Sequence, residues 1–125
     1  MSALVYQRIL VGTDGSKTAS VAVDRAADVA KATGATLTLL SVGGRAESVI
    51  AAESKRLEGS GVEVYGLAEQ GDPASVLIDT ATSGGFDLLV VGNKGMTGAS
   101  RFFLGSVPNK ISHHSPCALL IVRTT

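Results

Sequence analysis

The sequence predicts a single α/β domain with a five-stranded parallel sheet and helices on both faces of that sheet. Three observations support this prediction. The chain has 125 residues, a usual size for one domain. Strand-like apolar segments alternate with segments of helical periodicity, which is typical of parallel sheets with right-handed crossovers. Glycines stand where several of the strands are expected to end.

The first strand is expected at residues 9–11, a short apolar run that leads into the turn Gly-Thr-Asp-Gly-Ser at 12–16. A helix follows this turn. Ser16 can cap its N-terminus, alanines recur along it at helical spacing, and Gly34 offers a C-terminal stop. The second strand is expected at residues 36–42, which are rich in leucine and β-branched residues and precede a glycine pair.

A second helix is expected at residues 45–58, followed by a more polar third strand at 62–68 that we place at an edge of the sheet. Asp72 and Pro73 then begin a third helix, because aspartate caps free amides and proline suits the first helical position. The apolar residues expected to form the buried stripe of the second helix are Ala46, Val49, Ile50 and Leu57.

The fourth and fifth strands are expected at residues 88–91 and 118–122. Both are continuous apolar runs, the pattern of strands covered on both faces. A short helix from Ser106 to about His113 is expected between them, and Pro116 prevents its continuation. In open sheets of this kind, ligands bind beyond the carboxyl ends of the strands, where the strand order reverses. The glycine-rich turns after the first and fourth strands would meet there.

Composition narrows the classes of function. Eleven Lys and Arg balance eleven Asp and Glu, and aromatic residues make up 4%, so we expect no nucleic-acid partner. No apolar run approaches the roughly 20 residues that span a bilayer. Residues 1–7 lack the pattern of an export signal, so we expect no membrane partner and a cytoplasmic location. The single cysteine, Cys117, cannot form an internal disulfide, and no Cys/His cluster has the spacing of a zinc site.

The most informative segment follows the fourth strand and reads GNKGMTGASRFFLGS over residues 92–106, a G-x2-G-x9-G-S pattern. Its glycines would let backbone N–H groups approach anionic oxygens. Free amides and the positive end of the helix dipole at Ser106 and Val107 favour a phosphate, and Lys94 could neutralise its charge. The segment therefore predicts a phosphate-binding site.

Two better-known phosphate-binding motifs do not fit these turns. The Walker A pattern fails because no glycine precedes Lys17, and the Rossmann G-x-G-x-x-G spacing is absent. A glycine-rich connection without a ligand is the alternative, and such a pattern arises by chance roughly 0.03 times in a chain of this composition. Asp14 directly follows the first strand, where it could bond a ribose or base or only cap the following helix.

Together these features resemble the universal stress protein family, in its nucleotide-binding branch, over nearly the whole chain. The matching segments are VGTDGS at 11–16, GDPA at 71–74, LLVVG at 88–92, and the G-x2-G-x9-G-S pattern at 92–106, which is the family's ATP-binding signature.

The resemblance implies a doubly wound, flavodoxin-like sheet of strand order 3-2-1-4-5 and a homodimer. It implies bound ATP with Mg²⁺ or Mn²⁺, the ion being held mainly by the phosphates. Thr13 and Asp14 would contact the adenosine part, and Val42 would meet adenine through its backbone. The residues that would hold ribose and phosphates are Gly92, Lys94, Gly95, Gly105, Ser106 and Val107.

One departure from the family lies between Ser41 and Ile50, where many members carry a longer segment. The adenine side is therefore expected to be more open, and AMP or a cyclic nucleotide is an alternative ligand. At the other edge of the sheet, the apolar strand Ala118–Val122 invites pairing with a second copy. The resemblance points to the same dimer contact.

Three functions remain open at this point. The first is a regulatory, ATP-binding stress-response protein with little or no turnover. The second is a slow ATPase or phosphotransferase, and the third is an interaction module that needs no ligand. No Asp or Glu lies between Gly92 and Ser106, so no general base is evident near a terminal phosphate and no catalytic residue is assigned. This favours the first function.

Overall fold

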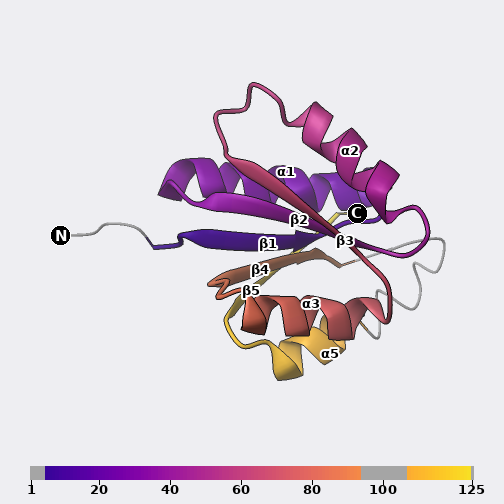
Figure 1. Cartoon of the computed structure of the whole chain (residues 1–125). Coiled ribbons are helices and arrows are strands. Elements are labelled where there is room, and N and C mark those ends of the chain that lie inside the picture. Colours follow the sequence, from indigo (N-terminus) through magenta and orange to yellow (C-terminus); the bar gives the residue numbers. More distant parts are fainter. Residues whose placement is uncertain (1–4, 94–106, 125) are drawn as a thin grey trace.

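The computed structural model describes residues 5–93 and 107–124, which form a parallel sheet of order β3-β2-β1-β4-β5 with flanking helices (Figure 1). The predicted fold class and strand order are confirmed. The strands are β1 (Arg8–Gly12), β2 (Thr36–Val42), β3 (Val64–Glu69), β4 (Leu88–Gly92) and β5 (Ala118–Val122). The helices are α1 (Lys17–Thr33), α2 (Ala46–Arg56), α3 (Pro73–Ser83) and α5 (Val107–His114).

Helices cover both faces of the sheet, with α1 and α2 on one face and α3 and α5 on the other (Figure 1). Side chains of β1 alternate between the two cores, because successive residues of a strand point to opposite faces. Ile9 and Val11 pack with α1, whereas Leu10 packs with α3 and α5. Burial on both faces explains why β1 and β4 are continuous apolar runs.

The predicted ends of α1 are confirmed. The hydroxyl of Ser16 accepts a hydrogen bond from the Ala19 N–H at 3.1 Å, and Gly34 ends the helix in the left-handed region at a φ of 79°. The Gly34 N–H donates to the Ala30 carbonyl at 2.8 Å. No helix in the described part of the chain is long and apolar enough to cross a membrane.

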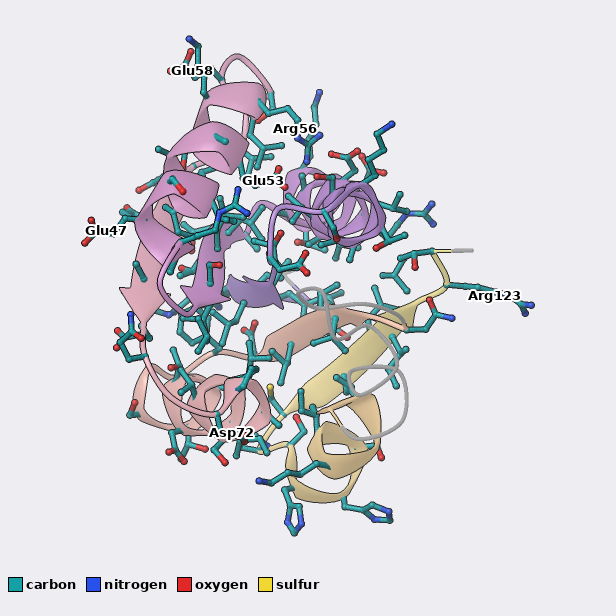
Figure 2. All side chains as sticks on the ribbon, turned by 90° about the vertical axis from the view of Figure 1, so that its right-hand side faces the viewer. Glu47, Glu53, Arg56, Glu58, Asp72 and Arg123 are labelled. Atoms are coloured by element: carbon teal, nitrogen blue, oxygen red, sulfur yellow. The ribbon has the colours of Figure 1, made fainter. Side chains whose placement is uncertain are left out.

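The buried stripe of α2 differs from the prediction at two positions. Ile50 is half-buried, whereas Glu53 is only 3% exposed. The Glu53 carboxylate accepts a hydrogen bond from the Ser20 hydroxyl of α1 at 2.6 Å and pairs with the Arg56 guanidinium at 2.6 Å. Arg56 also reaches Asp24 of α1 at 2.6 Å. This network, seen between α2 and α1 in Figure 2, fastens the two helices together.

The two edge strands of the sheet are β3 and β5, and β5 is more exposed than the sequence suggested. β3 is at an edge, as predicted. β5 is at the other edge, where Ala118 is exposed, Ile121 is 42% exposed and only Val122 is buried. In the single chain, β5 is therefore less covered than its apolar pattern predicted, because it has a neighbouring strand on one side only. This is the edge at which the sequence predicts pairing with a second copy.

Candidate functional site

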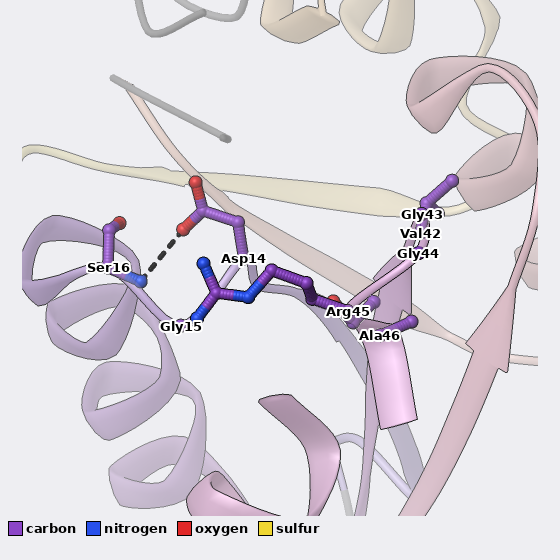
Figure 3. A pocket seen from close by; sticks show the side chains of 9 residues that line it. Asp14, Gly15, Ser16, Val42, Gly43, Gly44, Arg45 and Ala46 are labelled. Atoms are coloured by element: carbon purple, nitrogen blue, oxygen red, sulfur yellow. Dashed lines mark hydrogen bonds between the residues drawn. The ribbon is translucent and has the colours of Figure 1, made fainter. Parts of the chain in front are cut away.

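A pocket of about 540 Å³ lies beyond the carboxyl ends of β1 and β2 (Figure 3). This volume is within the range of roughly 300–1,000 Å³ that is usual for small-molecule sites. The β1–α1 turn forms one wall and the β2–α2 turn forms the other. The lining residues are Asp14, Gly15, Ser16, Ser41, Val42, Gly43, Gly44, Arg45 and Ala46.

The register of the sheet explains why these two turns meet. β1 and β2 are parallel, with Gly12 beside Leu40, and the Thr13 N–H donates to the Leu40 carbonyl at 2.9 Å. The residues that follow the two strands therefore leave the sheet side by side, at the carboxyl ends of the strands. Asp14 and Val42 are distant in sequence, but both line this pocket.

Side chains of the β1–α1 turn hold its own backbone. Thr13 is fully buried, and its hydroxyl accepts a hydrogen bond from the Gly15 N–H at 3.0 Å. Asp14 Oδ1 accepts from the Ser16 N–H at 2.9 Å. Thr13 therefore supports the turn from behind and does not line the pocket.

Asp14 has one oxygen for the turn and one for another partner. Its Oδ1 shapes the start of α1, which is the capping role that the sequence left open. No residue in the described segments hydrogen-bonds to its Oδ2, which points away from Ser16 in Figure 3. The half-buried carboxylate can therefore accept a hydrogen bond from a ligand hydroxyl or amine.

Gly15 lets the β1–α1 turn approach α2 closely. Its φ of 81° is in the left-handed region, where side chains are rarely tolerated. A Cβ at this position would lie 3.2 Å from Cγ2 of Val49 on α2. The glycine thus keeps the turn in contact with α2 below the pocket.

The β2–α2 turn contains only Gly43, Gly44 and Arg45 between the strand and the helix. No side chain caps the N-terminus of α2. Arg45 is exposed, and its side chain extends from this turn into the pocket, toward the β1–α1 turn (Figure 3). Sequence reasoning placed Arg45 at the start of the helix and did not assign it to the site. The short connection between the second strand and the second helix was the sequence feature that could have indicated this position of Arg45.

On the other side of β1, Gly92 ends β4 and is buried. The following residue, Asn93, is fastened to the end of β5: its N–H donates to the Val122 carbonyl at 2.9 Å. Asn93 Oδ1 accepts from the N–H and the hydroxyl of Thr124, at 2.9 and 3.0 Å. The chain therefore leaves β4 from an anchored position.

The predicted phosphate segment lies mostly outside the described residues. Lys94, Gly95, Gly105 and Ser106 belong to residues 94–106, which the structure does not describe. Val107 is the first residue of α5. The C-terminus of α5 leads into β5, which begins at the end of the sheet where all the parallel strands begin. The N-terminus of α5 therefore faces the end where the strands finish. The structure thus places Gly92 and the start of α5 at the carboxyl ends of the strands, which is also where the pocket lies.

Asp72 ties α5 to α3. It caps α3 by accepting from the Ser75 N–H at 3.0 Å, and Lys110 of α5 lies 3.5 Å from the carboxylate and 3.0 Å from the Ser75 hydroxyl. The backbone N–H of Ser75, its hydroxyl and the charge of Lys110 hold the pKa of Asp72 below its ordinary value. Figure 2 shows Asp72 on the opposite face of the sheet from Glu53 and Arg56.

Within residues 5–93 and 107–124, no group of three or more His, Cys, Asp or Glu side chains is arranged to hold a metal ion. His113 and His114 are exposed at the end of α5. Cys117 is half-buried, and burial raises the pKa of its thiol. These described side chains thus form no cluster beside the pocket.

Comparison with family models finds the universal stress protein family, whose model matches residues 5–48 and 43–123. The two matches overlap at 43–48, which are the β2–α2 turn and the start of α2. The match to the family therefore divides at that turn.

Similar proteins are known from several bacteria. The universal stress protein YxiE of Bacillus subtilis is 31% identical over 150 aligned positions, covering 95% of this chain and 100% of that protein. A universal stress protein crystallised in complex with cAMP is 33% identical, covers 96% of this chain and 98% of its own, and superimposes with a TM-score of 0.83. Protein Rv1636 of Mycobacterium tuberculosis is 39% identical, covers 96% of this chain and 97% of its own, and gives a TM-score of 0.67.

Proposed function

Because the chain belongs to the universal stress protein family, we propose that it binds an adenine nucleotide, and ATP in particular, as a regulatory stress-response protein with little or no turnover. The observation that carries this proposal is the pocket in which Asp14 and Val42 meet, at the same edge of the sheet as Gly92 and the start of α5. The switch in strand order between β1 and β4 is where α/β sheets of this type bind ligands.

The base and ribose would occupy the pocket between β1 and β2. Asp14 Oδ2 would accept hydrogen bonds from a ribose hydroxyl, since its other oxygen is already used by Ser16. The backbone of Val42 would meet the edge of adenine. The similar structure that contains cAMP supports an adenine nucleotide as the ligand class.

The phosphates would lie toward β4 and α5. Free N–H groups and the positive end of the helix dipole at Val107 favour an anion there. Gly92 would begin the phosphate-binding segment, and Lys94, Gly95, Gly105 and Ser106 would complete it. Asp14 is the one carboxylate among the described residues that line the pocket. Mg²⁺ or Mn²⁺ would therefore be held mainly by the nucleotide's phosphate oxygens and by water.

A cyclic nucleotide is the second candidate ligand. The similar structure with a TM-score of 0.83 is described as a complex with cAMP. The three-residue β2–α2 turn also leaves the base side of the pocket with little cover. ATP and a cyclic nucleotide would use the same pocket, so the two candidates differ in the cellular nucleotide to which the protein would respond.

Calorimetric titration of ligand-free protein with ATP, AMP and cAMP, each with and without Mg²⁺, tests the proposal. Tighter binding of ATP, strengthened by Mg²⁺, is the expected result, whereas tighter binding of cAMP would select the second candidate. Asp14→Asn keeps an oxygen for the Ser16 N–H but removes the charge, so we expect a loss of about 1–2 kcal/mol in binding with little change in folding. No binding of any of these nucleotides would contradict the proposed function.

We further propose a homodimer through the β5 edge. β5 is an edge strand without a charged residue, and Ile121 is 42% exposed. Exposed apolar edges favour pairing with another chain. Sedimentation analysis should give a dimer for the unmodified protein and a monomer for Ile121→Lys. A monomeric unmodified protein, or a variant that dimerises equally well, would contradict this arrangement.

A further inference from the structure

We propose that Arg45 determines the affinity of the pocket for the base, by laying its planar guanidinium group on the face of a bound purine. This inference rests on the proposed nucleotide-binding function and names a side chain that the sequence pattern of the family did not single out. Arg45 lines the pocket and extends into it from the β2–α2 turn (Figure 3).

The guanidinium of Arg45 is available for a ligand. No hydrogen bond or ion pair joins it to any residue in the described segments. Neighbouring arginines differ in this respect. Arg56 is held by Asp24 and Glu53, and Arg25 lies 3.8 Å from Asp28. Arg45 can therefore meet a ligand without first breaking a contact within the fold.

Among the described residues that line the pocket, Arg45 is also the one with a large planar group. None of these described residues has an aromatic side chain, and Gly43 and Gly44 contribute no side chain at all. A base that enters between the two turns needs a surface on which to pack, and a guanidinium stacks on aromatic faces because it is planar and weakly hydrated. Arg45 supplies the surface that the glycines cannot.

The short β2–α2 turn explains why a single side chain has this role. The alignment with the Bacillus subtilis relative has 150 positions, whereas this chain has 125 residues, so at least 25 positions are gaps in this chain. The two family matches overlap at 43–48, so the match to the family divides at the β2–α2 turn. With only Gly43, Gly44 and Arg45 between β2 and α2, Arg45 is the one long side chain that this turn contributes to the pocket wall.

The strand order separates Arg45 from the phosphate side. Arg45 follows β2, whereas Gly92 follows β4, and β1 lies between these strands. Adjacent strands are about 4.8 Å apart, so the ends of β2 and β4 are separated by about 10 Å across the sheet. The turn that carries Arg45 therefore lies across β1 from the phosphate side, at the part of the pocket where the base is proposed to bind.

Titration of the unmodified protein and of its variants with three probes, namely AMP, adenosine and ribose 5-phosphate, tests this role. Arg45→Ala should weaken AMP and adenosine binding by the same factor, about 3- to 30-fold, and leave ribose 5-phosphate unaffected. Arg45→Lys keeps the charge but not the plane, so it should recover little of this loss. Lys55→Ala removes an exposed cation farther along α2 and is the matched control, with no change expected.

The outcomes separate this inference from the proposed function. If Arg45→Ala weakens AMP but not adenosine, and Arg45→Lys restores the affinity, then Arg45 contacts the phosphate and the inference is overturned. Undiminished affinity of Arg45→Ala for both AMP and adenosine would also overturn it, while leaving nucleotide binding intact. If the unmodified protein binds neither AMP nor adenosine, this role of Arg45 is overturned, and the titrations with ATP and cAMP decide whether the proposed function fails with it.

Discussion

The β1–α1 turn and the β2–α2 turn face each other across the pocket but hold their backbones differently. In the first turn, Thr13, Asp14 and Ser16 each accept a hydrogen bond from a backbone N–H nearby. In the second, no side chain caps the helix, and Arg45 extends into the pocket instead. In the first turn, these hydrogen bonds leave Oδ2 of Asp14 as the acceptor for a ligand, whereas the second turn keeps the whole Arg45 side chain for binding. Loss of Gly15 or of the Ser16 cap in the first turn should therefore act mainly on stability, and substitution of Arg45 in the second mainly on affinity.

The largest effect on stability is expected from the glycines of the two turns. Gly15→Ala places a Cβ 3.2 Å from Val49 at a φ of 81°, so it should lower the free energy of unfolding by about 1–3 kcal/mol. At Gly44, a Cβ would meet no atom within 4 Å, and its φ is not in the left-handed region. Gly44→Ala should be neutral or stabilise the protein by up to about 1 kcal/mol.

Urea unfolding of the two glycine variants beside the unmodified protein measures this difference. Equal losses in the free energy of unfolding of Gly15→Ala and Gly44→Ala would contradict the proposed difference between the two turns. A larger loss in Gly44→Ala than in Gly15→Ala would also contradict this difference.

An intermediate effect is expected from the residues that precede α1 and α2. Ser16→Ala removes the hydrogen bond to the Ala19 N–H and should cost about 1 kcal/mol of stability, the usual value for a lost N-cap. Arg45→Ala removes no cap and should change stability by less than about 0.5 kcal/mol. Thermal unfolding followed by circular dichroism is the measurement. Equal losses in the two variants would show that the starts of α1 and α2 are not held differently.

The smallest effect is expected from acidification at α3, whose cap is a titratable group. Contacts with Ser75 and Lys110 lower the pKa of Asp72 in the folded protein. Its contribution is therefore fully present above the unfolded-state pKa of about 3.9 and is lost as the pH falls through the lower folded-state value. Asp72→Asn can still cap the helix but does not titrate.

The stability advantage of the unmodified protein over Asp72→Asn should therefore shrink as the pH is lowered from neutrality into this range. Urea unfolding at a series of pH values measures it. A constant difference between the two proteins at every pH would show that the carboxylate charge of Asp72 has no such role. The uncapped start of α2 has no acidic cap, so this prediction also separates α3 from α2.

Local chemistry made much of the fold predictable from the sequence. Ser16 and Gly34 act on residues three or four positions away, so the ends of α1 could be predicted correctly. The limits of β2 at Thr36 and Val42 were also predicted, because glycines flank an unbroken β-rich run. The shared location of Asp14 and Val42 followed from the rule that parallel strands present their carboxyl ends at one edge.

Other features depended on contacts that are distant in sequence. The buried carboxylate of Glu53 depends on Ser20, 33 residues away, and no periodic pattern reports such a partner. The exposure of β5 depends on which strand lies beside it. The position of Arg45 in the pocket depends on how closely the β1–α1 turn approaches α2 at Gly15 and Val49. The roles of Lys94, Gly95, Gly105 and Ser106 stay predictions.

The bonds between Thr124 and Asn93 have a practical consequence for handling the protein. They hold the end of the described chain beside the residue that follows β4, at the carboxyl edge. Val5, by contrast, precedes β1 at the opposite edge (Figure 1). An affinity tag, fluorophore or surface attachment placed before Val5 therefore stands at the opposite end of the strands from the pocket, whereas one joined after Thr124 would stand at the same end of the strands as the pocket.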